Sequence, residues 1–245
     1  MRGSDFKIFY ITFRKDYKIK KLILFMKRKF KIFLFRHGRT NYNVKEKFTG
    51  WQDAHLVFRG KLDTRKVSKK LKNEKFQVAI ATSLSRSKET LNYIIKRHPE
   101  CKKIIIDDRM IERSYGILEG QTHKSFIKEI GKHSYDLRRE GDAIENLNPK
   151  LRKKVEKFFG EKEYEAIHRG YDVKIPGGES FLDVEKRVKL FVNWLKKYVR
   201  KNKVNVAISA HGNSIRLFRK IMEDASRDKT IKWVIPYDKV FVYKI

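Results

Sequence analysis

Two apolar runs of this chain each lead into a His-Gly step. The run KIFLF at 31–35 precedes RHG at 36–38, and the run VNVAI at 204–208 is followed by HGN at 211–213. Short apolar runs of this kind are typical of strands buried inside a sheet. In open α/β sheets, ligands bind outside the carboxyl ends of the strands. The two histidines, although 174 positions apart, are therefore expected to face one cavity.

Strand-like and helix-like patterns alternate from residue 30 onward. In the segment 180–200, apolar residues recur every three or four positions, which predicts a helix with one apolar face. The alternation favours a three-layer α/β/α fold with a mostly parallel sheet flanked by helices. The segment 132–178 is the least regular part and is expected to form an insertion over the site. The predicted strands are 30–36, 77–82, 103–107, 204–210 and 239–244, and the predicted helices are 60–73, 84–97, 121–131, 150–159, 180–200 and 213–223.

The composition excludes several classes of protein. The chain has 245 residues, of which 40% are hydrophobic, so a packed core is possible. Cys101 is the only cysteine, so no internal disulfide can form, and a reducing, cytoplasmic location is expected. No apolar run approaches the roughly 18 residues that span a bilayer, and no membrane partner is expected.

The charge of the chain is strongly positive. Its 60 Lys and Arg residues outnumber 29 Asp and Glu residues, for a net charge of +31. Three interpretations are open: a solvated surface, binding to nucleic acid, and attraction of a small anionic substrate. The lysines are dispersed and form no recognised RNA- or DNA-binding motif, so no specific nucleic-acid partner is expected. We expect a small phosphorylated substrate, and a homo-oligomer is possible.

Residues 1–29 differ from the rest and form a basic extension. They carry ten Lys or Arg and two acidic residues. The aromatic and β-branched residues at 6–13 are typical of an extra strand. Met26 lies just before the first core strand, and we expect that translation can begin there, so that the preceding residues are not native. Residues 30–245 are expected to form a single catalytic domain.

Six short motifs follow one another in this domain. Taken singly each is weak, because a lone His-Gly after a strand is more often a turn than a catalyst. In this order, however, the motifs resemble the histidine phosphatase superfamily, and within it the cofactor-dependent phosphoglycerate mutase branch. The resemblance covers residues 30–245 and implies the phosphoglycerate mutase-like fold. The motifs are RHGRT at 36–40, FTGWQD at 48–53, TSLSR at 82–86, ERSYG at 112–116, GES at 178–180 and AHGNSIR at 210–216.

The residue types in these motifs suit phosphoryl transfer. A neutral imidazole, here that of His37, can attack phosphorus and form a phosphoramidate, which splits one transfer into two steps. The transition state spreads negative charge over the equatorial oxygens, so the site needs fixed positive donors. Arg36, Arg86 and a protonated His211 are expected to supply them, because a guanidinium fork can bind two phosphate oxygens. Glu112 is the expected general acid and base.

The resemblance also implies how the substrate is held. Asn213 adds a neutral donor, and Asn43 is a further substrate-binding residue. Priming by 2,3-bisphosphoglycerate is implied, and no metal is needed. The residues implied to hold the remote phosphate or carboxylate are Thr49, Gly50, Tyr115, Arg138 and Arg139. The remaining histidines share no metal-ligand spacing and are interpreted as surface or packing residues: His55, His98, His123, His133 and His168.

Some positions depart from the mutase pattern. Arg39 stands where mutases usually have an acid, and RHGRT is frequent in the phosphatase branch. His123 falls near the position of a substrate-binding lysine, and Tyr42 replaces a common tryptophan.

We expect interconversion of 3-phosphoglycerate and 2-phosphoglycerate, as in glycolysis and gluconeogenesis. A phosphomonoesterase that uses the same residues is the alternative. A third hypothesis is a basic nucleic-acid-binding or regulatory protein. The complete set of site residues argues against it.

Overall fold

The computed structural model describes residues 29–139 and 144–245. Residues 1–28, with the strand expected at 6–13 and Met26, lie outside the described residues. Within the described ranges, no helix combines the length and the apolar character that a membrane span requires.

The centre of the fold is a mixed sheet, whose strands in the described residues are β1 (Lys31–Arg36), β2 (Val78–Ala81), β3 (Lys103–Ile106), β4 (Val206–Ala210) and β5 (Val240–Lys244). Their spatial order is β3-β2-β4-β1-β5. Ile208 of β4 aligns with Leu34 of β1 and with Ile80 of β2, both in parallel register. β3 is parallel to β2, and β5 is antiparallel to β1. The first four strands therefore end at one edge, which confirms the predicted mostly parallel sheet.

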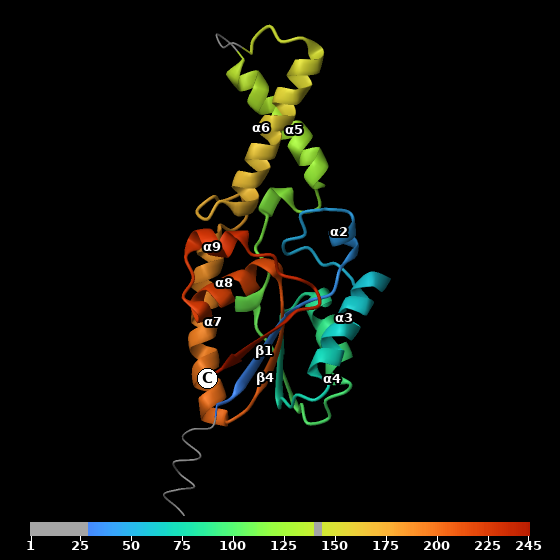
Figure 1. Ribbon diagram of the computed structural model, residues 1–245, viewed down its shortest axis with the longest axis vertical. Helices are drawn as coiled ribbons and strands as arrows, with labels where there is room; N and C mark the ends of the chain where they lie inside the picture. Colours follow the sequence, from blue (N-terminus) through green and yellow to red (C-terminus); the bar gives the residue numbers. More distant parts are fainter. Residues whose placement is uncertain (1–28, 140–143) are drawn as a thin grey trace, which may run out of the picture.

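Helices cover both faces of this sheet (Figure 1). Successive side chains of a strand point to opposite faces, and β1 shows this alternation. Ile32 and Leu34 pack with α7 and α8 on one face, whereas Phe33 and Phe35 pack with α3 and α4 on the other. All four side chains are fully buried, so the three-layer fold is confirmed. The helices of the described residues are α2 (Asn41–Val44), α3 (Phe58–Leu71), α4 (Ser85–Ile95), α5 (His123–Arg138), α6 (Pro149–Arg169), α7 (Phe181–Asn202), α8 (Gly212–Glu223) and α9 (Arg227–Lys232).

Two helix starts position the site. At the start of α7, the hydroxyl of Ser180 accepts from the backbone N–H of Asp183, whose carboxylate accepts from Ser180 in return. At the start of α8, His211 is the residue that caps the helix. Because α8 begins directly after β4, the first backbone N–H groups of the helix lie beside the end of the sheet.

Most of the segment 132–178 that the structure describes is helical, so the expected irregularity is wrong for residues 132–138 and 149–169. α5 and α6 form a helical hairpin that projects away from the sheet (Figure 1). The helices cross where Gly131 and Gly160 allow backbone contact: a Cβ on Gly160 would lie 2.0 Å from the carbonyl oxygen of Ile127. Gly160 is the only buried residue of α6. A helix that buries so little has no continuous apolar stripe, which is why its full length is hidden in the sequence.

Candidate active site

The two predicted histidines meet where β1 and β4 end. The backbone N–H of His37 donates to the carbonyl of Ala210 over 3.0 Å, which ties the two strand ends together. The imidazole rings of His37 and His211 lie 5.0 Å apart between centroids and are tilted by 56°. Both side chains are buried, with 2% and 0% exposure. The parallel register of β1 and β4 thus places the histidines together, as the sequence predicts.

The contacts of His37 suit a nucleophile. Its Nδ1 lies 2.8 Å from the carbonyl oxygen of Gly38. Because a carbonyl only accepts, Nδ1 carries the proton and Nε2 keeps its lone pair. Burial, followed by the charges of Arg86 and Arg36, holds the pKa of His37 well below its usual range. The ring is therefore neutral near pH 7, as attack on phosphorus requires.

Arg36 and Arg86 form no ion pair within the described residues. Nη1 of Arg36 donates to the carbonyl of Ile235 over 3.2 Å. Arg86 donates to the carbonyls of Gly50 and Gln52, over 2.7 and 2.9 Å. Burial lowers the pKa of Arg86 to about 10, so this side chain stays charged near neutral pH. Two guanidiniums beside a nucleophile, neither in an ion pair with a carboxylate of the described residues, suit a bound phosphoryl group.

His211 corrects one expectation about charge. Its Nε2 lies 2.8 Å from Oγ1 of Thr82, and its Nδ1 is buried without a partner in the described residues. Burial, then the charge of Arg86, hold the pKa of His211 well below its usual range. The side chain is therefore neutral rather than protonated, because burial and the nearby guanidiniums of Arg86 and Arg36 disfavour a further positive charge.

Glu112 is fixed through both its side chain and its backbone. Its Oε1 accepts from the backbone N–H groups of Arg113 and Asn213, over 2.8 and 3.1 Å. Its carbonyl accepts from Nε1 of Trp51 over 2.8 Å. The other carboxylate oxygen lies beside Gly212, where an added Cβ would be 3.6 Å from Oε2. One carboxylate oxygen is thus held while the other faces the start of α8, an arrangement suited to proton transfer.

Arg187 supports Glu112 from α7. Its guanidinium pairs with Glu179 over 2.9 Å and donates to the carbonyl of Glu112 over 3.0 Å. Glu179 in turn accepts from the backbone N–H of Ser114 over 3.0 Å. The sequence contained no sign of this role, because Arg187 lies 75 positions from Glu112 in an ordinary amphipathic helix.

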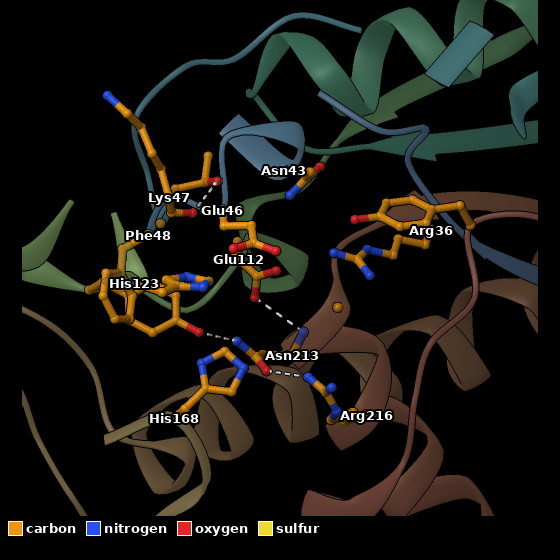
Figure 2. A pocket seen from close by; sticks show the side chains of 15 residues that line it. Arg36, Asn43, Glu46, Lys47, Phe48, Glu112, His123, His168, Asn213 and Arg216 are labelled. Carbon is orange, nitrogen blue, oxygen red and sulfur yellow. Dashed lines mark hydrogen bonds between the residues drawn. The ribbon is translucent and has the colours of Figure 1, made fainter. Parts of the chain in front are cut away.

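A cavity of about 300 Å³ opens beside these residues (Figure 2). The predicted site residues that line it are Arg36, Asn43, Thr49, Gly50, Glu112, Tyr115 and Asn213. His37, Arg86 and His211 are buried next to it and are not among its lining residues. Tyr237 also lines the cavity, and its ring lies 4.0 Å from Cζ of Arg36 and 6.5 Å from the His37 ring.

Several cavity residues are absent from the sequence prediction: Glu46, Lys47, His123, His168, Arg216 and Tyr237. The interpretation of His123 and His168 as surface or packing residues is therefore incomplete, because both line the cavity. They come from the base of the helical hairpin, where the hydroxyl of Tyr164 lies 3.2 Å from Nδ1 of His123. The one sequence signal for these residues was that His123 falls near the position of a substrate-binding lysine.

Arg138 and Arg139 do not line the cavity, which corrects their expected place in the site. Arg138 ends α5 at the far part of the hairpin, pairs with Glu163 over 3.6 Å and packs on Phe159. Arg138 and Arg139 stand at the end of α5, and the hairpin that α5 forms with α6 projects away from the sheet (Figure 1). Across the described ranges, no group of three or more His, Cys, Asp or Glu side chains is placed to hold a metal ion.

Comparisons with known proteins agree with this geometry. The sequence model of a family described as the histidine phosphatase superfamily (branch 1) matches residues 32–158 and 143–245. A 2,3-bisphosphoglycerate-dependent phosphoglycerate mutase of Mesorhizobium japonicum is 30% identical over 216 residues, which cover 86% of this chain and 90% of that protein.

Solved structures share the fold. A phosphoglycerate mutase from Bacillus anthracis superposes with a TM-score of 0.65 at 21% identity, covering 89% of this chain and 88% of that one. An alpha-ribazole phosphatase from Shigella flexneri gives a TM-score of 0.64 at 18% identity, covering 86% and 89%. Proteins named as mutases and as phosphatases thus have the same fold as this chain.

Proposed function

The chain belongs to branch 1 of the histidine phosphatase superfamily, and we propose that it interconverts 3-phosphoglycerate and 2-phosphoglycerate through phospho-His37. One observation carries the proposal: a neutral imidazole with a free Nε2 lies beside two guanidiniums that form no ion pair within the described residues, near the fixed carboxylate of Glu112. The relative from Mesorhizobium japonicum, named as a mutase, supports the choice of substrate.

In the first half-reaction, Nε2 of His37 attacks phosphorus and the ester P–O bond breaks. Glu112 serves as the general acid that gives the leaving oxygen a proton. Arg36 and Arg86 offset the negative charge on the equatorial oxygens, and they do so without moving because carbonyls already hold them. In the second half-reaction, Glu112 takes the proton of a glycerate hydroxyl, whose oxygen attacks phosphorus and breaks the N–P bond.

We further propose that 2,3-bisphosphoglycerate primes the enzyme. It carries a phosphoryl group on each hydroxyl, so donation of either group to His37 leaves a monophosphoglycerate of the kind that the cycle handles. The cationic side chains of the cavity, among them Arg36, Lys47 and Arg216, suit such an anion. No step of this scheme requires a metal ion.

One observation favours phosphatase activity as the second candidate. A mutase must keep water away from the phosphohistidine. The hairpin of α5 and α6 projects away from the sheet, and only its base reaches the cavity, through His123 and His168 (Figure 1). A cavity that the hairpin does not cover is open to hydrolysis of phospho-His37.

Paired assays distinguish the two candidates. Conversion of 3-phosphoglycerate to 2-phosphoglycerate and release of inorganic phosphate are measured on the same preparation, with and without 2,3-bisphosphoglycerate. The mutase proposal expects isomerisation that depends on the bisphosphate and exceeds phosphate release. Phosphate release without isomerisation would instead establish the phosphatase.

The role of His37 is tested separately. His37→Ala is expected to abolish acid-labile phosphorylation of the protein and turnover in both assays. His55→Ala is the matched control, because His55 is exposed and bound to Glu89 over 2.6 Å, away from the cavity residues. Full activity of His37→Ala would refute a phosphohistidine at this position.

A further inference from the structure

Arg216 is a cation at the cavity that takes no part in the phosphoryl-transfer steps above. It lies in α8, one turn after Asn213, and lines the cavity. It forms no ion pair with a carboxylate of the described residues. Burial lowers the pKa of Arg216 to about 10, so the guanidinium remains charged near pH 7. A largely buried guanidinium without a neutralising partner is costly unless an anion binds it.

The orientation of Arg216 is fixed by two acceptors. Its Nη1 donates to Oδ1 of Asn213 over 2.6 Å, and its Nε donates to the carbonyl of Trp233 over 2.8 Å. The amide of Asn213 is itself oriented, because its Nδ2 donates to the hydroxyl of Tyr115 over 3.2 Å. Nη2 of Arg216 has no such partner in the described part of the chain. A donor held in this way can bind an anion with little loss of conformational entropy.

His168 lies on the same wall of the cavity. Figure 2 shows His168, Asn213 and Arg216 in a row. The ring of His168 stacks on Tyr164, with centroids 5.1 Å apart and planes 13° apart, so its direction is set by packing. Its Nδ1 is buried without a partner in the described residues. A fixed ring with an unsatisfied nitrogen can contribute a hydrogen bond to a bound group.

We propose that Arg216, with His168 beside it, binds the carboxylate of the substrate while Arg36 and Arg86 bind the phosphoryl group. The assignment rests on the proposed function for its substrate, a phosphorylated hydroxy acid. It places carboxylate recognition on α8 and the base of the hairpin, rather than on Arg138 and Arg139. A bidentate or charge-assisted contact to a carboxylate suits the guanidinium, and the neutral ring of His168 adds no competing charge.

The test compares two ligands that differ at one group. 3-Phosphoglycerate carries a carboxylate where glycerol 3-phosphate carries a hydroxymethyl group. Binding of each is measured by calorimetry in the His37→Ala background, so that neither ligand is turned over. We expect 3-phosphoglycerate to bind about tenfold to a hundredfold more tightly, the range for a hydrogen bond to a charged group.

Variants of Arg216 locate the source of that preference. Arg216→Gln is expected to bind both ligands about equally while its affinity for glycerol 3-phosphate changes little, and Arg216→Lys should keep part of the preference. Arg219→Gln is the matched control, because Arg219 lies on α8 but pairs with Glu223 over 3.0 Å. The control should retain the full preference.

Other outcomes overturn the assignment. It is wrong if the background protein shows no preference for the carboxylate ligand, or if Arg216→Gln weakens both ligands equally, as a structural role would. These results are independent of the mutase assay. A preference that depends on Arg216 in a protein without isomerase activity would retain the carboxylate site and remove only the mutase proposal. If isomerisation is unaffected in Arg216→Gln, the mutase proposal is retained and the carboxylate site at Arg216 is removed.

Discussion

Histidines whose pKa values are lowered should make this protein sensitive to mild acid. Burial, followed by the charges of Arg169 and Arg216, lowers the pKa of His168 to about 3. The pKa values of His37 and His211 are likewise held well below their usual range, first by burial. Below about pH 6.5 the unfolded chain takes up protons that the folded protein does not, so stability falls as the pH falls through this range.

The size of the effect can be worked out for His168. At about pH 5, roughly 1.5 units below the ordinary pKa of histidine, a ring that stays neutral in the folded state lowers the free energy of unfolding by about 2 kcal/mol. Because the folded-state pKa of His168 is about 3, its ring stays neutral in the folded protein over the whole range between pH 6.5 and 5. His37 and His211 act in the same direction, so the combined loss is a large fraction of a typical stability of about 5–15 kcal/mol.

A double difference isolates His168. The free energy of unfolding is measured by urea denaturation at about pH 7.5 and about pH 5, for the wild type and for His168→Asn. The variant should lose about 2 kcal/mol less than the wild type between the two pH values. The opposite contribution of exposed His55, whose pKa is raised by its bond to Glu89, is present in both proteins and cancels.

His133→Asn serves as the matched control, since it removes an exposed histidine from the same hairpin. Its pH dependence should follow that of the wild type. If His168→Asn and the wild type lose the same stability between the two pH values, the reasoning from burial to a depressed pKa is refuted for this residue.

Three further predictions concern the hairpin, the cavity and the charge. Gly160→Ala should lower the free energy of unfolding by about 1–3 kcal/mol in urea denaturation, because its Cβ would lie 2.0 Å from the carbonyl of Ile127; unchanged stability would contradict the close crossing. Tyr237→Ala should speed modification of His37 by diethyl pyrocarbonate several-fold, since it removes the ring beside His37 and Arg36; an unaltered rate would exclude a covering role. For the wild type, kcat/KM should fall as ionic strength rises from about 0.01 M to about 0.15 M, and a flat profile would leave the net charge of +31 without a role in substrate capture.

The predicted sheet agrees with the observed one because its buried strands are continuous apolar runs that can be recognised in the sequence. Ile32 to Phe35 are apolar on both faces, and each face meets a different pair of helices. The helix of 180–200 was likewise predictable, since its buried residues recur along one stripe. By contrast, α6 buries only Gly160 and contacts mainly α5, so its apolar residues follow no pattern that a sequence reveals.

The residues of the site likewise include some that the sequence predicts and some that it does not. His37, Glu112 and His211 lie in short motifs, and their positions follow from strand ends and from the first turn of α8. Arg187 contacts Glu112, and His168 lines the cavity, from helices far along the chain, where each looks like an ordinary helix residue. Arg138 and Arg139 show the converse: a suitable pair of side chains in the sequence lies on a hairpin that carries them away from the cavity.

The sequence by itself determined the order of elements and the chemistry at the strand ends, because the buried strands and the His-Gly steps are local features. Only the tertiary structure decided the charge and the surroundings of those groups. Burial beside Arg86 makes His211 neutral, and the start of α8 orients Asn213 so that Arg216 faces the cavity. These properties depend on distances between residues from different elements, and such distances exist only after the chain has packed.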